Sequence, residues 1–186
     1  MIHLIDFDGM IKDLFILEHF VYGTEKYIKK NKINYENYGS IFEFHDYKGL
    51  LKTHVTNTLI NNATKLRIAM DYLRYDNEDE EFNLDKLDKE CRTNLNIARF
   101  LDSKKENITI RNSCNKIIHA TRIDAIWSDE KTTFDFWTGK YTLYGSYKKK
   151  KWTFELNIAD WCTAMINFIE EINELIDWNS SFKYDS

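Results

Sequence analysis

The stretch that decides the fold is residues 134–160, FDFWTGKYTLYGSYKKKKWTFELNIAD, because its hydrophobic residues follow a different period from those elsewhere in the chain. Apolar and polar residues alternate here, which is typical of half-buried β-strands. The alternating apolar residues are Phe134, Phe136, Tyr141, Leu143, Trp152, Phe154 and Leu156. Thr138-Gly139 and the segment 145–150 separate these runs as turns. The pattern predicts a three-stranded antiparallel meander between about residues 132 and 157, and no other sheet.

On both sides of this stretch the apolar residues recur about every 3.6 positions, which indicates helices. The predicted helices cover residues 10–30, 47–75, 84–98 and 110–121, and the helical period returns near Asp160 for a last helix. Residues 40–43 (SIFE) have the form of a capping box for the second helix, although Asp46 fits the cap equally well. Thr109 is the expected cap of the fourth helix, and Asn157 or Asp160 is that of the last.

The length and composition narrow the fold class. The chain has 186 residues, which suits one domain spanning residues 1–186. It has no proline and six glycines, too few turn-forming residues for a β-sandwich or barrel and fewer glycines than a large doubly wound α/β fold needs. We therefore expect a mainly α fold of the α+β class, a bundle of four or five helices with the β-meander inserted before the C-terminal helix.

Charge and cysteine content argue against several functional classes. The net charge of −4 is unlike that of a general nucleic-acid coat protein, although residues 148–151 are four consecutive lysines. The three cysteines form no C-x-x-C pair, so we expect neither a disulfide framework nor a metal site, and no cofactor. No apolar run reaches the ~18 residues of a membrane span, and the N-terminus lacks the basic start of a signal peptide. The sequence predicts a cytoplasmic protein without a membrane partner.

The segment with the most chemical meaning is ITIRNSCNKIIHATR, which begins at Ile108. On a helix, Arg111, Asn115 and His119 follow one another at i, i+4 and i+8 and line one stripe, with Asn112 beside it. Arginine suits phosphate, histidine exchanges a proton near neutral pH, and asparagine can orient either group. RNA supplies its own nucleophile, the 2′-hydroxyl, so a site of this composition needs no metal. A solvated polar helix face gives the same stripe, and both interpretations stay open here.

The same residues resemble the signature of the HEPN superfamily, in which an arginine and a polar residue are followed on one helix by a histidine. Arg111-Asn112 and His119 match it, and NKIIHA at residues 115–120 is similar to helical segments of uncharacterised bacterial proteins of that type. Seven residues separate Arg111 from His119, whereas the usual number is four to six. The resemblance implies a small helical bundle and a metal-independent endoribonuclease of toxin–antitoxin or anti-phage systems.

The resemblance also implies the roles of individual residues. Arg111 and His119 are the expected catalytic residues, supported by Asn112 and Asn115. It further implies a homodimer with a composite cleft, and an antitoxin or defence-system protein as a possible partner. The five tryptophans also favour a homodimer, since one bundle leaves part of so much apolar surface uncovered.

The predicted RNA contacts are basic side chains near the stripe. Arg122, Lys116 and Lys150 are the expected contacts with the RNA backbone. His54, on the second helix, could face the same cleft as His119. The alternative function is a catalytically inactive HEPN-like module that binds a protein partner or RNA.

A competing motif lies at the N-terminus. Residues 4–9, LIDFDG, match the hydrophobic-D-x-D-G opening of haloacid dehalogenase-like phosphatases, in which Asp6 would attack phosphate and Asp8 would handle the proton. Such enzymes need a parallel sheet, and no glycine-punctuated series of strands and helices follows. We therefore expect Asp6 or Asp8 to cap the first helix instead.

Overall fold

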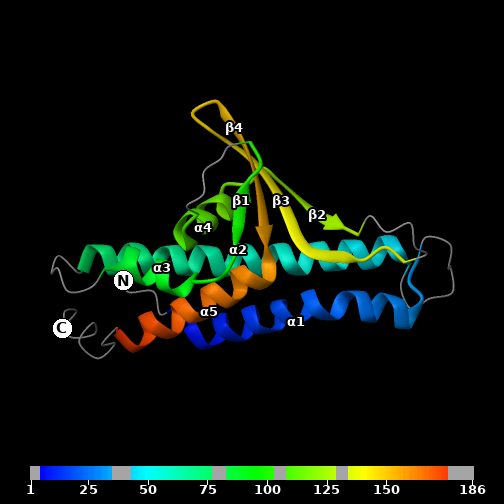
Figure 1. The fold of residues 1–186 in the computed structure, drawn as a ribbon, viewed down its shortest axis with the longest axis horizontal. Helices are drawn as coiled ribbons and strands as arrows, with labels where there is room; N and C mark the ends of the chain where they lie inside the picture. The colour runs from blue at the N-terminus through cyan, green and yellow to red at the C-terminus, as the bar shows by residue number, and fades with distance from the viewer. Residues whose placement is uncertain (1–4, 35–42, 77–82, 103–107, 129–133, 176–186) are drawn as a thin grey trace.

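Two long antiparallel helices, α1 (Phe7–Asn31) and α2 (Phe44–Asp76), run through most of the length of the molecule (Figure 1). The computed structural model describes residues 5–34, 43–76, 83–102, 108–128 and 134–175. The other elements are α3 (Leu84–Cys91), β1 (Ala98–Phe100), α4 (Ile110–Ile118), β2 (Arg122–Trp127), β3 (Trp137–Tyr147), β4 (Lys150–Asn157) and α5 (Ile158–Leu175). α5 packs along α1, and α4 packs on α2. The expected mainly helical α+β fold is confirmed.

The start of α1 settles the interpretation of the N-terminal aspartates. Asp6 is the N-cap of α1, and its Oδ1 accepts a hydrogen bond from the Gly9 backbone N at 2.8 Å. Every strand pairing among the described residues is antiparallel. The capping prediction is confirmed for Asp6, and the parallel sheet that a phosphatase needs does not occur in the described part of the chain.

Several helices begin or end at residues other than the predicted ones. α2 begins at Phe44, so Asp46 lies in its first turn rather than at its cap, and residues 40–42 are outside the described residues. The third helix ends at Cys91, not at residue 98, and Asn94 then takes a left-handed conformation with φ 63°. α5 follows directly on Asn157, whose side chain donates to Asp160 Oδ2 at 2.8 Å.

The sheet has four strands rather than the expected three, in the order β1-β4-β3-β2. The range 132–157 supplies only β3 and β4, and β1 and β2 lie outside it. β1 has three residues, too few to show a period, and only its first residue, Ala98, falls within the predicted third helix. β2 was missed because most of its side chains on both faces are partly buried, which blurs its alternation.

Gly139 is a bulge within β3 and not the predicted turn. β2 pairs Ile126 with Lys140 but Trp127 with Trp137, so the register shifts at Thr138-Gly139. Gly139 has φ +76°, and a Cβ there would lie 2.3 Å from Val21 Cγ1 on α1. A glycine is required at this position because the strand bends against a helix.

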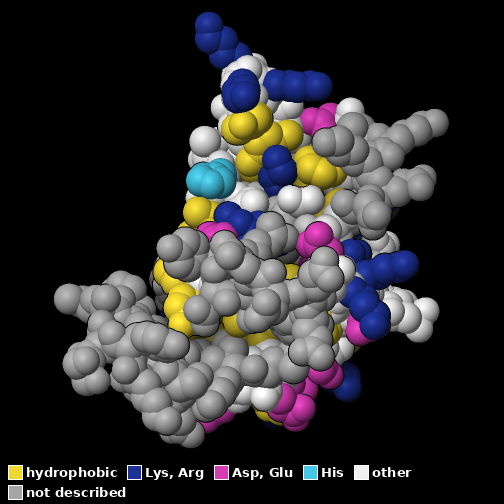
Figure 2. All heavy atoms as spheres, turned by 90° about the vertical axis from the view of Figure 1, so that its left-hand side faces the viewer, with side chains coloured by type: hydrophobic (Ala, Val, Ile, Leu, Met, Phe, Trp, Pro, Cys, Tyr) yellow, Lys and Arg dark blue, Asp and Glu magenta, His cyan; other side chains and the backbone are white. Residues whose placement is uncertain are grey.

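The hairpin between β3 and β4 projects beyond the helices (Figure 1). Tyr147 pairs with Lys150, which leaves Lys148 and Lys149 as a two-residue turn with φ 47° and 66°. Positive φ at both positions is the type I′ geometry that Asn-Gly normally supplies. Lys and Arg side chains gather at this end of the molecule above a hydrophobic area (Figure 2).

The main core lies between the helices and one face of the sheet. Its largest fully buried side chains are Trp137, Trp161, Tyr141, Phe154 and Phe168. Among the described residues, no helix is long and apolar enough to cross a membrane.

Candidate functional site

α4 carries the predicted catalytic stripe, and three hydrogen bonds fix its first turn. The Thr109 hydroxyl accepts from Asn112 N at 3.0 Å, so the predicted cap is confirmed. Asp88 Oδ1 of α3 accepts from Ile110 N at 2.6 Å. Trp161 of α5 donates from Nε1 to the Ser113 hydroxyl at 2.9 Å. The position of the stripe is therefore set by neighbours on both sides of α4.

Asp88 is a buried carboxylate that joins α3 to α4. Only 3% of the residue is exposed, and its Oδ2 accepts from Arg92 Nε at 2.7 Å. Burial raises the pKa of Asp88, and the charge and hydrogen bonds of Arg92 oppose that increase only in part. The ion pair and the bond to Ile110 hold the N-terminus of α4 in place.

Arg111 lies in a charged cluster that spans α2 and α4. Its Nη2 and the Nη1 of Arg67 both contact Asp71 Oδ1, each at 2.5 Å. Arg67 Nε also donates to Asn115 Oδ1 at 2.7 Å. We call these four residues the arginine cluster. It contains two guanidinium groups and one carboxylate, and therefore has an excess positive charge.

Asp71 bridges the two arginines and is more than half exposed. Burial raises the pKa of its carboxyl, but the hydrogen bonds and charges of Arg67 and Arg111 outweigh burial and lower the pKa below the ordinary value. Asp71 is therefore ionised at neutral pH, and it holds the two guanidinium groups next to each other.

One part of Arg111 is buried without a hydrogen-bond partner among the described residues, its Nη1. Arg111 lines a cavity of about 30 Å³ together with Thr109 and the acidic residues Asp85 and Asp88. This volume is about that of one water molecule. The guanidinium is therefore only partly satisfied by Asp71.

His119 is the C-cap of α4 and not part of a helix reaching residue 121. The residue is exposed, and its backbone N donates to Asn115 O at 3.1 Å. Its imidazole makes no hydrogen bond with any described residue, so the backbone bond to Asn115 alone joins His119 to the described residues of the arginine cluster. Arg111 and His119 are eight positions apart, so their Cα atoms are separated by about 12 Å along the helix axis. The structure thus unites Arg111 with Asn115 but leaves His119 one turn further on.

The remaining predicted residues lie beside the cluster or on the sheet. Asn112 is exposed on α4. Lys116 Nζ lies 4.2 Å from the centroid of the Trp152 ring, on the sheet side of α4. Arg122 begins β2 instead of extending the helix; it forms an ion pair with Asp124 at 2.5 Å and lies over the Tyr144 ring. Lys150 is exposed at the hairpin tip. Lys116, Arg122 and Lys150 therefore belong to the sheet and hairpin face.

Sequence reasoning missed Arg67 and Asp71. They are four residues apart on α2, like Arg111 and Asn115 on α4. Since Arg111 meets Asp71 and Asn115 meets Arg67, the two helices match in antiparallel order. The i, i+4 spacing of Arg67 and Asp71 was the only available signal, and it says nothing about which helix lies opposite.

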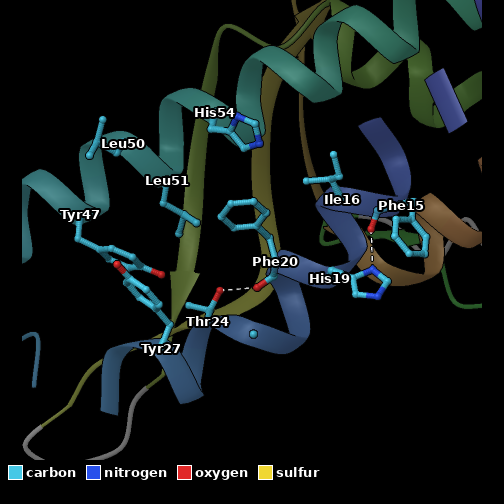
Figure 3. A pocket seen from close by; sticks show the side chains of 11 residues that line it. Phe15, Ile16, His19, Phe20, Thr24, Tyr27, Tyr47, Leu50, Leu51 and His54 are labelled. Atoms are coloured by element: carbon cyan, nitrogen blue, oxygen red, sulfur yellow. Dashed lines mark hydrogen bonds between the residues drawn. The ribbon is translucent and has the colours of Figure 1, made fainter. Parts of the chain in front are cut away.

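His54 does not face the same cleft as His119. Its ring lies 5.2 Å from the ring of Phe20, at the other end of α2 and against α1. Here the two helices enclose a groove of about 800 Å³, which we call the α1–α2 groove (Figure 3). Phe20 points from α1 towards Leu51 and His54, and Tyr27 of α1 stacks on Tyr47 of α2 with centroids 5.9 Å apart. The groove is apolar and distinct from the arginine cluster.

Within the described residues, no three His, Cys, Asp or Glu side chains lie close enough together to hold a metal ion. The cysteines Cys91, Cys114 and Cys162 are buried and free.

In the comparisons with known proteins, no protein-family model, no curated protein and no solved structure matches the chain.

Proposed function

We propose that this chain is a metal-independent RNA endonuclease of HEPN type, of the kind that acts in toxin–antitoxin or anti-phage systems. The observation that supports this most is the arginine cluster, in which Asp71 holds Arg67 of α2 beside Arg111 of α4. His119 is the C-cap of the same helix α4. A phosphodiester needs positive charge near its non-bridging oxygens and a group that accepts a proton. The arginine cluster and His119 would supply these two functions.

The guanidinium groups keep donors for a substrate. Each has five N–H donors, and the described bonds use two of them in Arg67 and one in Arg111. The two donors on Arg111 Nη1 are buried, which leaves three in Arg67 and two in Arg111. A phosphate accepts such donors in pairs. Arg67 and Arg111 would therefore stabilise the negative charge that develops on phosphorus during attack.

The reaction would use the ribose as its own nucleophile. The 2′-oxygen attacks the adjacent phosphorus, the bond from phosphorus to the 5′-oxygen breaks, and the 5′-oxygen takes a proton from water. His119 accepts the proton of the 2′-hydroxyl. The products are a 2′,3′-cyclic phosphate and a 5′-hydroxyl end. Asn115 would orient Arg67 through its bond to Nε. Asn112 lies exposed on α4, on the same helix as Asn115.

The alternative, a non-catalytic module that binds RNA or a protein partner, is favoured by two features. Asp71 already contacts both guanidinium groups, and the ~12 Å of helix between Arg111 and His119 exceeds the span of one phosphate. In that case the cluster and the Lys150 hairpin would bind RNA phosphates, and His119 would be a surface residue.

A cleavage assay on a defined single-stranded RNA, with and without EDTA, separates the two functions. We expect cleavage that survives EDTA and leaves a cyclic phosphate. His119→Ala should lower the rate about 10²–10⁴-fold, and Arg111→Ala or Arg67→Ala about 10²–10³-fold. His45→Ala, an exposed histidine on the first turn of α2, is the matched control and should cleave normally.

Binding of 2′-O-methyl RNA, which cannot form the cyclic product, should persist in His119→Ala. Binding by the wild type without cleavage of any RNA would establish the non-catalytic module instead. Cleavage that is unchanged in His119→Ala, or that stops with EDTA, would refute the mechanism.

A further inference from the structure

The α1–α2 groove exposes large apolar side chains that the fold does not cover. The exposed fractions are 54% for Phe15, 38% for Ile16, 41% for Phe20, 41% for Tyr27 and 57% for Leu50. All five line the groove. Single exposed apolar residues are ordinary, but a contiguous group of this size marks an interaction site.

The groove stays open because α5 lies along the other half of α1. α5 has 18 residues, against 25 in α1 and 33 in α2. Thr163, near the start of α5, bonds to Glu18 of α1. α5 therefore runs from the middle of α1 back towards its N-terminus, and away from the first turns of α2 (Figure 1). No described helix lies over the groove.

The sequence predicts a dimer partly because five tryptophans would leave apolar surface uncovered, but in the described part of the chain the tryptophans are buried or half-buried. Trp137, Trp152 and Trp161 are buried, and Trp127 is half-buried. Trp178 lies outside the described residues. The uncovered apolar surface consists instead of phenylalanine, tyrosine, leucine and isoleucine side chains on α1 and α2.

From these observations we infer that a second copy of this chain docks through the α1–α2 groove, α1 against α1. The α1 stripe of Phe15, Ile16 and Phe20 both lines this groove and presents side chains that can fill a partner's groove. In a twofold interface the same patch of each protomer must fit against itself. The α1 stripe meets this requirement if its side chains enter the groove of the partner while its own groove receives those of the partner. Gly23 helps, because space is open where its Cβ would be, so another helix can approach closely.

The exposed area agrees with this occupant. A large apolar or aromatic side chain has a surface of about 150–250 Å², so the five exposed fractions together present roughly 450 Å² of apolar surface. This is more than half of the ~800 Å² per partner of a standard interface, and a polar rim would supply the rest.

The inferred interface lies away from the arginine cluster. His54 in the groove and Arg67 in the cluster are 13 residues apart, or about 20 Å along α2. Such a dimer keeps each Arg111 and His119 within its own protomer. It therefore differs from the composite cleft that the resemblance to HEPN proteins implies, and it does not depend on the proposed function.

Light scattering after size exclusion, between about 5 and 100 µM, tests the inference. We expect a dimer for the full chain and a monomer for Phe20→Glu and Leu50→Glu. Loss of a central aromatic anchor should raise the dimer dissociation constant at least about 30-fold. Ile68→Glu is the matched control, because Ile68 is also exposed on α2 but lies beside Arg67 and outside the groove. It should remain a dimer.

Both groove residues are exposed, so their variants should keep the wild-type helical circular dichroism. In a second test, Phe20→Cys should crosslink with a short bismaleimide, because the three natural cysteines are buried. A monomeric wild type would overturn the inference and leave the groove to a different partner. A dimer that Ile68→Glu disrupts and Phe20→Glu does not would place the interface at the arginine cluster.

Discussion

From Tyr47 to His54, α2 presents its side chains to an apolar groove with no described element above it, whereas from Arg67 to Asp71 it presents charges that α4 matches one by one. In the polar half, Asp71 faces Arg111 and Arg67 faces Asn115, so α4 supplies a partner for each of these two charges. The apolar half lacks a matching surface. One helix thus shows which contacts the fold supplies and which it leaves for another molecule.

The largest loss of stability should come from removing Asp88, which holds the N-terminus of α4 in place. Asp88→Ala removes the partner of the nearly buried Arg92 and the acceptor of Ile110 N. Breaking such a buried pair destabilises a protein by about 3–5 kcal/mol. Equilibrium urea unfolding would measure the loss. Asp85→Ala, one turn earlier on α3 and exposed, should change the free energy of unfolding by less than ~0.5 kcal/mol; a similar loss in both variants would contradict the assigned role.

Two adjacent leucines test the apolar half. Leu51 is buried at the groove and Leu50 is 57% exposed. Leu51→Ala should cost about 2–5 kcal/mol at any protein concentration. Leu50→Ala should cost little in dilute solution and more as concentration rises, because a bound second copy would cover it. Thermal unfolding over a 50-fold concentration range would measure both, and a concentration-independent Leu50→Ala would indicate that the groove stays open to solvent.

Asn115→Ala should have a smaller effect on the polar half. It removes the acceptor of Arg67 Nε, a hydrogen bond to a charged group at 2.7 Å. Such bonds contribute about 1.5–3 kcal/mol, and partial exposure places this one at the lower end. Urea unfolding beside Asn112→Ala, an exposed neighbour expected to be neutral, would isolate the bond. Equal effects would show that Asn115 does not hold Arg67.

The smallest predicted effect depends on pH. The pKa of Asp71 is lowered in the folded state, so its ion pairs stabilise the protein above the unfolded pKa of ~3.9 and are lost as pH falls through the lower folded pKa. Asp71→Asn should therefore be less stable than the wild type at pH 7, by at most about 1 kcal/mol for so exposed a pair. The difference should vanish towards pH 2 and shrink in 1 M salt. A difference that is constant across pH would exclude the ion pairs as its cause.

Long elements were predictable and contacts between distant segments were not. α1, α2 and α5 repeat their apolar period over many turns, so only their ends were misplaced. β2 is not predictable from the sequence because partial burial on both faces hides its alternation. Thr138-Gly139 has the composition of a turn, and the sequence does not reveal that Val21 lies against Gly139.

The same limit applied to the site. The stripe of Arg111 and Asn115 was visible at i, i+4 spacing, and it does lie on one helix. The Arg67–Asp71 pair that faces it comes from about 40 residues earlier. A hydrophobic period indicates which side of a helix is buried, but it does not indicate which charged residues of another helix lie opposite. The predicted helix extends to residue 121, whereas α4 ends at Ile118 with His119 as its C-cap, because no glycine marks its end.

At the turn of the hairpin tip, selection for stability and selection for two positive charges favour different residues. Lys148 and Lys149 hold left-handed backbone conformations that disfavour side chains by about 1 kcal/mol each or more, and Asn-Gly would relieve this at once. A lineage under selection for stability alone would lose these two charges, while one that needs them at the tip would tolerate the strain. The residues found at these two positions in natural variants would therefore record which pressure has prevailed, and the turn is the first place to engineer a more stable protein.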